Sequence, residues 1–211
     1  MLIYGRAFSF FLSLLIPFFL TRILVKEDYG SYQQLIMIYT IVQAILIFGM
    51  PQSLLYYFPR KETHEHPLLI KQTWTILLFS SLMVMAIFWL SSQIIGTHHL
   101  KEYLVLLGIY TSLMIFVMPI QNLLTLEGKI STAMWLMVFF TIIDLAVLPS
   151  AAWLNPTTLG IVHGIIVAAL LKAIMVLFHV FTTYFTKEIS GNSYIKEQLA
   201  YGIPVGLTAM V

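Results

Sequence analysis

Cysteine is absent from the sequence and charged residues are scarce. Without a thiol there is no disulfide, no thiolate-bound zinc or iron–sulfur cluster and no cysteine nucleophile. Only 9% of the residues are Asp, Glu, Lys or Arg, whereas a soluble domain carries about 25%. So few charges cannot cover a solvated surface, which excludes a water-soluble enzyme, a nucleic-acid-binding protein and a disordered regulator.

Long apolar runs make up most of the chain instead, since 60% of its 211 residues are hydrophobic. A transmembrane helix needs about 20 apolar residues, and six continuous runs approach or exceed that length. The runs occupy residues 7–24, 33–48, 73–95, 103–124, 133–153 and 159–185. None shows the short alternating pattern of a membrane β-barrel. We therefore expect an all-α, polytopic membrane protein with a six-transmembrane-helix bundle.

Helix breaks or kinks are expected in or directly after three of these runs. The second run continues as an amphipathic segment to Phe58 after a break at residues 49–51, and prolines 119 and 149 are expected to kink the fourth and fifth runs. A seventh apolar stretch starts at Gln198 and is too short to cross a bilayer about 30 Å thick. We expect residues 1–190 to form an N-terminal bundle and residues 191–211 to be a linker and the truncated start of a second bundle, in a longer protein.

The basic residues predict the orientation in the membrane. One side of the predicted topology holds Arg6, Arg60, Lys61, Lys71, Lys129, Lys187 and Lys196, and the other holds Arg22, Lys26 and Lys101. Because cytoplasmic segments carry the excess of Lys and Arg, the N-terminus is expected in the cytoplasm.

Two charged residues fall deep within apolar runs. Asp144 lies about 11 residues into the fifth run and Lys172 about 13 into the sixth, which places both near mid-membrane. A charge there costs about 2.5 to 3.5 kcal/mol, so each needs a partner or a water-filled cavity. One interpretation is a hydrated cavity where Lys172 meets a phosphate and Asp144 a coupling cation. The other is an ion pair that only fixes the register of the two helices.

His179 is a further pathway candidate. It follows Lys172 by seven residues, which places it within about 20° of the same helix face, whereas His163 points the opposite way. A hydrogen-bonded histidine at the membrane interface is favoured over a proton relay.

Polar residues share one face of the second predicted helix. Gln33, Thr40 and Gln43 are spaced by seven and three residues. Buried amides avoid lipid, so this face is expected to point into the bundle. Gln121 and Asn122 give the fourth run a similar polar end beyond its proline.

Small or weakly polar residues recur every four positions on the first run, at Gly5, Ser9, Ser13, Pro17 and Thr21. Two interpretations stay open, a cavity lining and close packing of helix backbones, and packing is favoured.

Arg22 ends the first run and is a candidate ligand for a diphosphate, because its planar donor fork matches phosphate geometry. The alternative is a surface ion pair with Glu27 or Asp28. Tyr29 and Gly30 are expected to shape the turn into the second helix, with a positive φ at the glycine.

Enzyme motifs are not found. The pairs His64/His66 and His98/His99 fall in loops on opposite sides of the membrane, so solvated histidines are favoured over a metal site. The chain has no glycine-rich phosphate loop, no G-x-S-x-G and no H-E-x-x-H. We expect no enzyme activity, no metal and no cofactor.

Several short motifs, in order, carry a family resemblance. TRILVKEDYGSYQQL is followed by FGMPQSLLYYFPR, then by LTLEGKIS and AYGIPVGL. The chain resembles the polysaccharide flippases, the O-antigen and exopolysaccharide exporters of the multidrug/oligosaccharidyl-lipid/polysaccharide superfamily. The residues that match the family pattern are Arg22, Glu27, Asp28, Tyr29, Gly30, Phe48, Gly49, Tyr56 and Tyr57.

The resemblance implies a transporter of the bacterial inner membrane that acts in cell-surface polysaccharide and lipopolysaccharide synthesis. It implies translocation of undecaprenyl-diphosphate-linked oligosaccharide or polysaccharide repeat units by alternating access between two helical bundles. Its partners would be the lipid-linked substrate, membrane lipids and the missing C-terminal half, with Na⁺ or H⁺ coupling. Alternatives are a cation-coupled multidrug or peptidoglycan-lipid-precursor exporter, an intramembrane enzyme of lipid-linked sugar metabolism, and a structural membrane subunit.

Overall fold

The computed structural model describes residues 2–94, 98–185 and 193–208. Within these ranges the chain is helical throughout apart from short connections and contains no strand, which confirms the all-α prediction. The α-helices are α1 (Leu2–Ile23), α2 (Lys26–Leu46), α3 (Met50–Tyr57), α4 (His66–Ile94), α5 (His98–Val117), α6 (Ile120–Leu126), α7 (Ile130–Leu154), α8 (Thr158–Val180) and α9 (Ile195–Thr208). A 3-10 turn, Phe58–Arg60, follows α3, and a π-helical turn, Phe181–Phe185, follows α8.

The helices are long and apolar enough for a multi-pass membrane protein. Five helical segments of the described chain qualify as spans by length and composition, and α2 with α3 forms a sixth if the pair, bent by 42°, counts as one span. These six segments correspond to the six apolar runs of the sequence.

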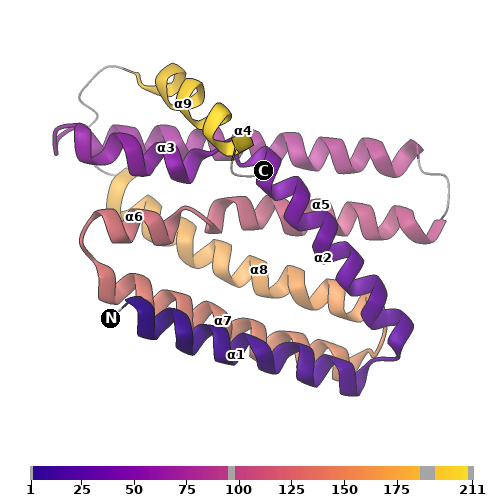
Figure 1. The fold of residues 1–211 in the computed structure, drawn as a ribbon. Helices are drawn as coiled ribbons and strands as arrows, with labels where there is room; N and C mark the ends of the chain where they lie inside the picture. Colours follow the sequence, from indigo (N-terminus) through magenta and orange to yellow (C-terminus); the bar gives the residue numbers. More distant parts are fainter. Residues whose placement is uncertain (1, 95–97, 186–192, 209–211) are drawn as a thin grey trace.

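The long helices lie side by side, and α2 crosses α5 and α8 obliquely (Figure 1). Helix α8 packs against both α5 and α7, while α4 packs on α5 and α1 packs on α7. The central position of α8 explains why half of its apolar span is buried, against 11% of the α1 span. The outer faces of the bundle carry the exposed large apolar side chains expected against lipid.

The small-residue stripe of the first helix is buried at its start, at Gly5 and Ser9, and exposed at its end, at Thr21. Ser9 is 4% exposed, and a Cβ at Gly5 would lie 2.0 Å from Met134 Cγ on α7. Small side chains let the two backbones approach closely. The structure therefore supports the packing interpretation of the stripe.

Two helical segments are interrupted in their second halves. Between α2 and α3 the backbone turns left-handed, with φ of 50° at Phe48 and 59° at Gly49. The carbonyl of Leu46 accepts a hydrogen bond from Ser80 Oγ on α4, so this backbone group stays paired at the break. The second interruption lies between α5 and α6, where Pro119 precedes the first residue of α6.

Pro149 behaves differently from Pro119. Helix α7 runs without interruption through Pro149, so only the first of the two expected proline kinks coincides with a helix break. A proline inside a membrane helix is tolerated when neighbouring helices and local adjustments satisfy the freed backbone group.

The expected turn at Tyr29 and Gly30 is wrong. Both residues lie inside α2, which starts at Lys26, and Gly30 is not among the glycines with positive φ. In the first turn of this helix, Asp28 Oδ1 accepts hydrogen bonds from the backbone N (2.9 Å) and Oγ1 (2.5 Å) of Thr158. Its charge also lies in the first turn of α2, where the helix dipole favours an acid. Asp28 thus ties the start of α2 to the start of α8.

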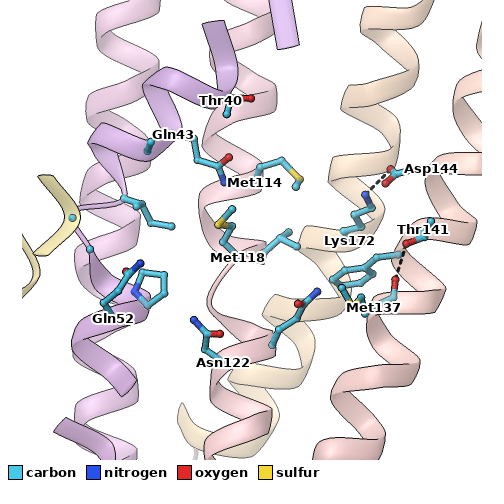
Figure 2. A pocket seen from close by; sticks show the side chains of 18 residues that line it. Thr40, Gln43, Gln52, Met114, Met118, Asn122, Met137, Thr141, Asp144 and Lys172 are labelled. Atoms are coloured by element: carbon cyan, nitrogen blue, oxygen red, sulfur yellow. Dashed lines mark hydrogen bonds and ion pairs between the residues drawn. The ribbon is translucent and has the colours of Figure 1, made fainter. Parts of the chain in front are cut away.

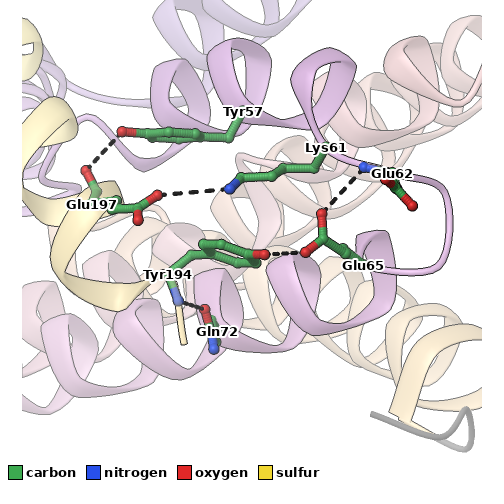
Figure 3. A network of polar contacts seen from close by, with 7 residues as sticks. All are labelled: Tyr57, Lys61, Glu62, Glu65, Gln72, Tyr194 and Glu197. Atoms are coloured by element: carbon green, nitrogen blue, oxygen red, sulfur yellow. Dashed lines mark hydrogen bonds and ion pairs between the residues drawn. The ribbon is translucent and has the colours of Figure 1, made fainter. Parts of the chain in front are cut away.

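Helix α9 is fastened to α3 and α4 at its N-terminal end by polar contacts (Figure 3). Tyr194 donates from its hydroxyl to Glu65 and from its backbone N to Gln72 Oε1 at 2.8 Å. Lys61 Nζ lies 3.9 Å from Glu197 Oε2. We call this cluster the α9 clasp; its members are Tyr57, Lys61, Glu65, Gln72, Tyr194 and Glu197.

Farther along α9, backbone meets backbone at the α2/α3 break. A Cβ at Gly49 would lie 2.1 Å from the carbonyl oxygen of Gly202 and 3.0 Å from the backbone N of Gly206. Only glycines permit this approach, so the family-like Phe-Gly pair here forms a seat for α9. Whether residues 191–211 begin a second bundle stays a prediction.

Candidate functional site

A cavity of about 620 Å³ lies where the two broken spans face α7 and α8. This volume is in the usual range of small-ligand sites. Its polar lining residues are Thr40, Gln43, Gln52, Gln121, Asn122, Thr141, Asp144 and Lys172. Its larger apolar lining residues are Ile47, Met114, Val117, Met118, Met137 and Phe140. Broken membrane helices with a polar cavity between them are typical of substrate sites in transporters.

An ion pair forms one wall of the cavity. Lys172 Nζ on α8 donates to Asp144 Oδ1 on α7 at 2.5 Å, and the ammonium lies 5.9 Å from the centre of the Phe140 ring. The Lys172 side chain is 7% exposed and that of Asp144 is 31% exposed. The ion pair, one of the arrangements that the sequence left open, is therefore formed, and the carboxylate is its more exposed partner.

Local sequence explains how the pair forms. Helices α7 and α8 are antiparallel neighbours joined by a short connection that contains Pro156, and Thr157 caps α8 by accepting from the backbone N of Gly160. Ala151 and Gly164 keep the two helices close, because a Cβ at Gly164 would lie 2.7 Å from Ala151 Cβ. Two opposite charges at matching depth then meet, and each offsets part of the cost of removing the other from water.

Uncharged amides form the opposite wall (Figure 2). Gln43 is 5% exposed, and its amide nitrogen faces the Tyr39 hydroxyl without a hydrogen bond of normal geometry. Gln52 Oε1 is buried without a hydrogen-bond partner among the described residues. Met114 and Met118 lie between this wall and the ion pair in Figure 2. The cavity is thus polar at both sides and apolar between them.

Four of the seven predicted pathway residues line this cavity: Asp144, Lys172, Thr40 and Gln43. Arg22, Gln33 and His179 do not belong to its lining, so their assignment to a pathway stays a prediction.

Gln33 does not point into the bundle as expected. It is exposed and donates to the Tyr29 hydroxyl at 2.8 Å. Helix α2 crosses the bundle obliquely (Figure 1), and among its residues only those of its second half, with Thr40 and Gln43, line the cavity.

Arg22 is exposed, and its guanidinium carbon lies 4.0 Å from the centre of the Phe18 ring. It forms no ion pair among the described residues, and Asp28 on the adjacent segment bonds to Thr158 instead. The expected ion pair of Arg22 with the acidic cluster is therefore not formed.

His179 lies about two turns beyond Lys172 on α8 and is half-buried. Its ring centre is 6.4 Å from that of Tyr184, in an edge-to-face arrangement, and Nε2 has no hydrogen-bond partner among the described residues. Tyr184 in turn donates to Glu127, at the end of α6. His163 is exposed, on the opposite side of α8 from buried Lys172.

Sequence reasoning missed Gln52. It follows the Gly49–Pro51 break directly, at the start of α3, where its polarity is easily attributed to a surface-facing amphipathic helix. The signal that identifies it is the break itself, because a polar residue at the start of a broken half-helix faces the gap between the halves.

The described histidines do not form a metal centre. His64 lies 3.2 Å from Glu62, and the His66 ring stacks 3.8 Å from that of Phe58. No group of three or more possible ligands is found among the described side chains, and those of His98 and His99 fall outside them.

The fold and the site define the class of the molecule, a multi-pass helical membrane protein with a charged cavity inside the bundle. The chain belongs to the polysaccharide biosynthesis protein family, whose sequence profile matches residues 1–211. The family points to polysaccharide biosynthesis and export, and its members are typically transporters or flippases rather than enzymes. No curated protein and no solved structure matches the chain significantly.

Proposed function

We propose that the protein translocates undecaprenyl-diphosphate-linked oligosaccharide or polysaccharide repeat units across the bacterial inner membrane. The observation that carries the proposal is the cavity, because it gathers Lys172, Asp144 and uncharged amides between membrane-spanning helices. A lipid-linked glycan has the matching parts: a diphosphate, sugar hydroxyls and an apolar tail. Family membership supports the same substrate class.

The ion pair supports a mechanism of exchange. A diphosphate that enters the cavity competes with Asp144 for the Lys172 ammonium, because both are anions. Once displaced, the carboxylate is left without its cation and takes up Na⁺ or H⁺ to restore neutrality. The 31% exposure of Asp144 favours this role over a purely structural pair, since a pair that only fixed helix register would gain from complete exclusion of water.

Alternating access in this proposal uses a second helical bundle, the partner that the family resemblance implies, which rocks against the first. The N-terminus is proposed to face the cytoplasm. The start of α1, the end of α3 and the start of α7 lie at one end of the bundle (Figure 1), and these segments carry Arg6, Arg60, Lys61 and Lys129. This concentration of basic residues suits the cytoplasmic side.

A leaflet-exposure assay tests the proposal. The full-length protein is reconstituted into liposomes that contain an undecaprenyl-diphosphate-linked oligosaccharide with a fluorescent sugar, and a membrane-impermeant quencher is added outside. Translocation predicts that quenching proceeds beyond the outer-leaflet fraction only when the protein is present. Quenching that stops at that fraction would contradict the proposal, and a changed covalent product would indicate an intramembrane enzyme.

A further inference from the structure

Four carboxamide side chains line the cavity, and Figure 2 shows Gln43 and Gln52 on the side away from the ion pair. They belong to three elements: Gln43 to α2, Gln52 to α3, and Gln121 and Asn122 to α6. We call them the carboxamide wall. All four lie close to the two helix breaks, before or after the bend of 42° between α2 and α3 or directly after Pro119 at the start of α6.

Two atoms of the wall are buried without a normal hydrogen bond among the described residues. Gln43 Nε2 is a donor and Gln52 Oε1 is an acceptor, and both atoms belong to side chains that line the cavity. A buried polar group without a partner destabilises the fold, and in native structures such a group is usually paired with protein, water or ligand. An unmatched donor and an unmatched acceptor on one wall thus indicate a ligand that both accepts and donates.

The chemistry of the wall selects among ligands. Carboxamides carry no charge, so they contribute nothing to holding a cationic drug or a phosphate by charge. Each offers donors and an acceptor, which matches a hydroxyl, itself a donor and an acceptor. Between the wall and the ion pair, Met114 and Met118 offer flexible, polarizable side chains that adapt to the C–H surface of a ring.

We propose that the carboxamide wall is the sugar subsite of the cavity and binds hydroxyl groups of the sugar attached to the diphosphate. This inference rests on the proposed function, in which Lys172 holds the diphosphate. Gln43 and Gln52 are its determining residues, and they make the protein distinguish a glycosylated lipid from the bare lipid diphosphate.

Two lipid probes test the subsite on the full-length protein in nanodiscs. One is undecaprenyl diphosphate, and the other is undecaprenyl diphosphate that carries one N-acetylglucosamine. The variants are Gln43→Met and Gln52→Met, which keep side-chain length and remove hydrogen bonding. Gln33→Met is the matched control, because Gln33 is an exposed glutamine of α2 outside the cavity. The ratio of the two affinities is measured on each protein, so a partly unfolded fraction cancels.

The wild-type protein and the Gln33→Met control are expected to bind the glycosylated lipid about tenfold more tightly than the bare lipid. Gln43→Met and Gln52→Met are expected to reduce this ratio about fivefold or more while leaving the affinity for the bare lipid unchanged. Lys172→Met is expected to weaken the binding of both lipids and to leave the ratio of their affinities unchanged.

Equal wild-type affinity for both lipids would overturn the sugar subsite and leave the proposed function standing. The sugar subsite would also be overturned if the Gln43 and Gln52 variants bound both lipids more weakly by the same factor, or if their affinity ratios equalled that of the control. Failure of the wild-type protein to bind either lipid would overturn the proposed function and the subsite together.

Discussion

Lys172 and Asp144, 28 residues apart in the sequence, meet across the α7/α8 interface with an Nζ–Oδ1 distance of 2.5 Å. Their contact joins two roles, because it neutralises two charges within membrane-spanning helices and forms one wall of the cavity. Replacing one partner by an apolar residue leaves the other charge buried and unpaired, whereas replacing both leaves no buried charge.

The first prediction concerns the stability of this pair. Lys172→Met and Asp144→Leu should each lower the free energy of unfolding by about 3 to 5 kcal/mol. The double variant should fall within about 1 kcal/mol of the wild-type protein, because apolar side chains replace both charges. Denaturation in detergent micelles measures all four proteins as a double-mutant cycle. Additive losses would show that the two residues do not act on each other.

The second prediction concerns the seat of α9. Gly49→Ala should destabilise the protein by about 2 kcal/mol or more, because alanine resists a left-handed backbone and its Cβ would collide with the Gly202 carbonyl. Gly30→Ala is the matched control. Gly30 lies inside α2 with open space around it, so alanine should stabilise by about 0.5 to 1 kcal/mol. Thermal unfolding of the two variants should therefore shift in opposite directions, and equal shifts would contradict the close approach at Gly49.

The third prediction assigns a structural role to an acid of the family-like motif. Asp28→Ala should cost about 1 to 2 kcal/mol, because Thr158 at the start of α8 loses both hydrogen bonds to the carboxylate. Glu27→Ala, in the same first turn but exposed, should have little effect. Unfolding midpoints in detergent compare the two variants. Similar losses at both positions would indicate a general charge effect instead of a specific bond.

The fourth prediction is a pH dependence of the α9 clasp. The hydrogen bond from the Tyr194 hydroxyl lowers the pKa of Glu65 and raises that of Tyr194 to about 12, so the phenol remains a donor. A carboxyl with a lowered pKa stabilises the folded state above its ordinary pKa, and this contribution is lost as the pH falls through the lowered value. Acidification below about pH 4 should therefore loosen the start of α9.

Hydrogen-exchange protection factors of residues 195–199 measure this effect. They should fall on acidification in the wild-type protein and in the exposed control Glu62→Gln. In Glu65→Gln they should start lower and change less. Protection that is independent of pH in the wild-type protein would show that Glu65 does not hold α9.

Much of the fold follows from hydrophobic length alone. The six apolar runs predict the six membrane segments because a single segment surrounded by lipid can pair its own backbone N–H and C=O groups only as a helix. The break at Gly49 and the interruption at Pro119 could be predicted from the sequence, because glycine permits a left-handed backbone and proline lacks the N–H that continues a helix. The hydrogen bonds between Asp28 and Thr158, 130 residues away, could not be predicted, because the sequence does not show that the starts of α2 and α8 lie together.

Part of the candidate site could also be predicted from the sequence. A charge deep in an apolar run needs a partner whatever the packing, so Asp144 and Lys172 could be paired from depth alone. The positions of Gln33 and Gln52 relative to the cavity could not be predicted. They depend on the tilt of α2 and the direction of α3, which arise from contacts with α5, α8 and α9. Helical spacing within one element cannot supply such an angle.

The double variant Asp144→Leu/Lys172→Met in the leaflet-exposure assay tests the central claim most directly. The stability cycle above checks that this protein is folded, and its transport then reports on the role of the charges alone. The account predicts that the wild-type protein exposes the fluorescent lipid-linked oligosaccharide to the quencher and that the folded double variant does so at least about tenfold more slowly. Translocation by the double variant at the wild-type rate would contradict the claim that this ion pair handles the substrate.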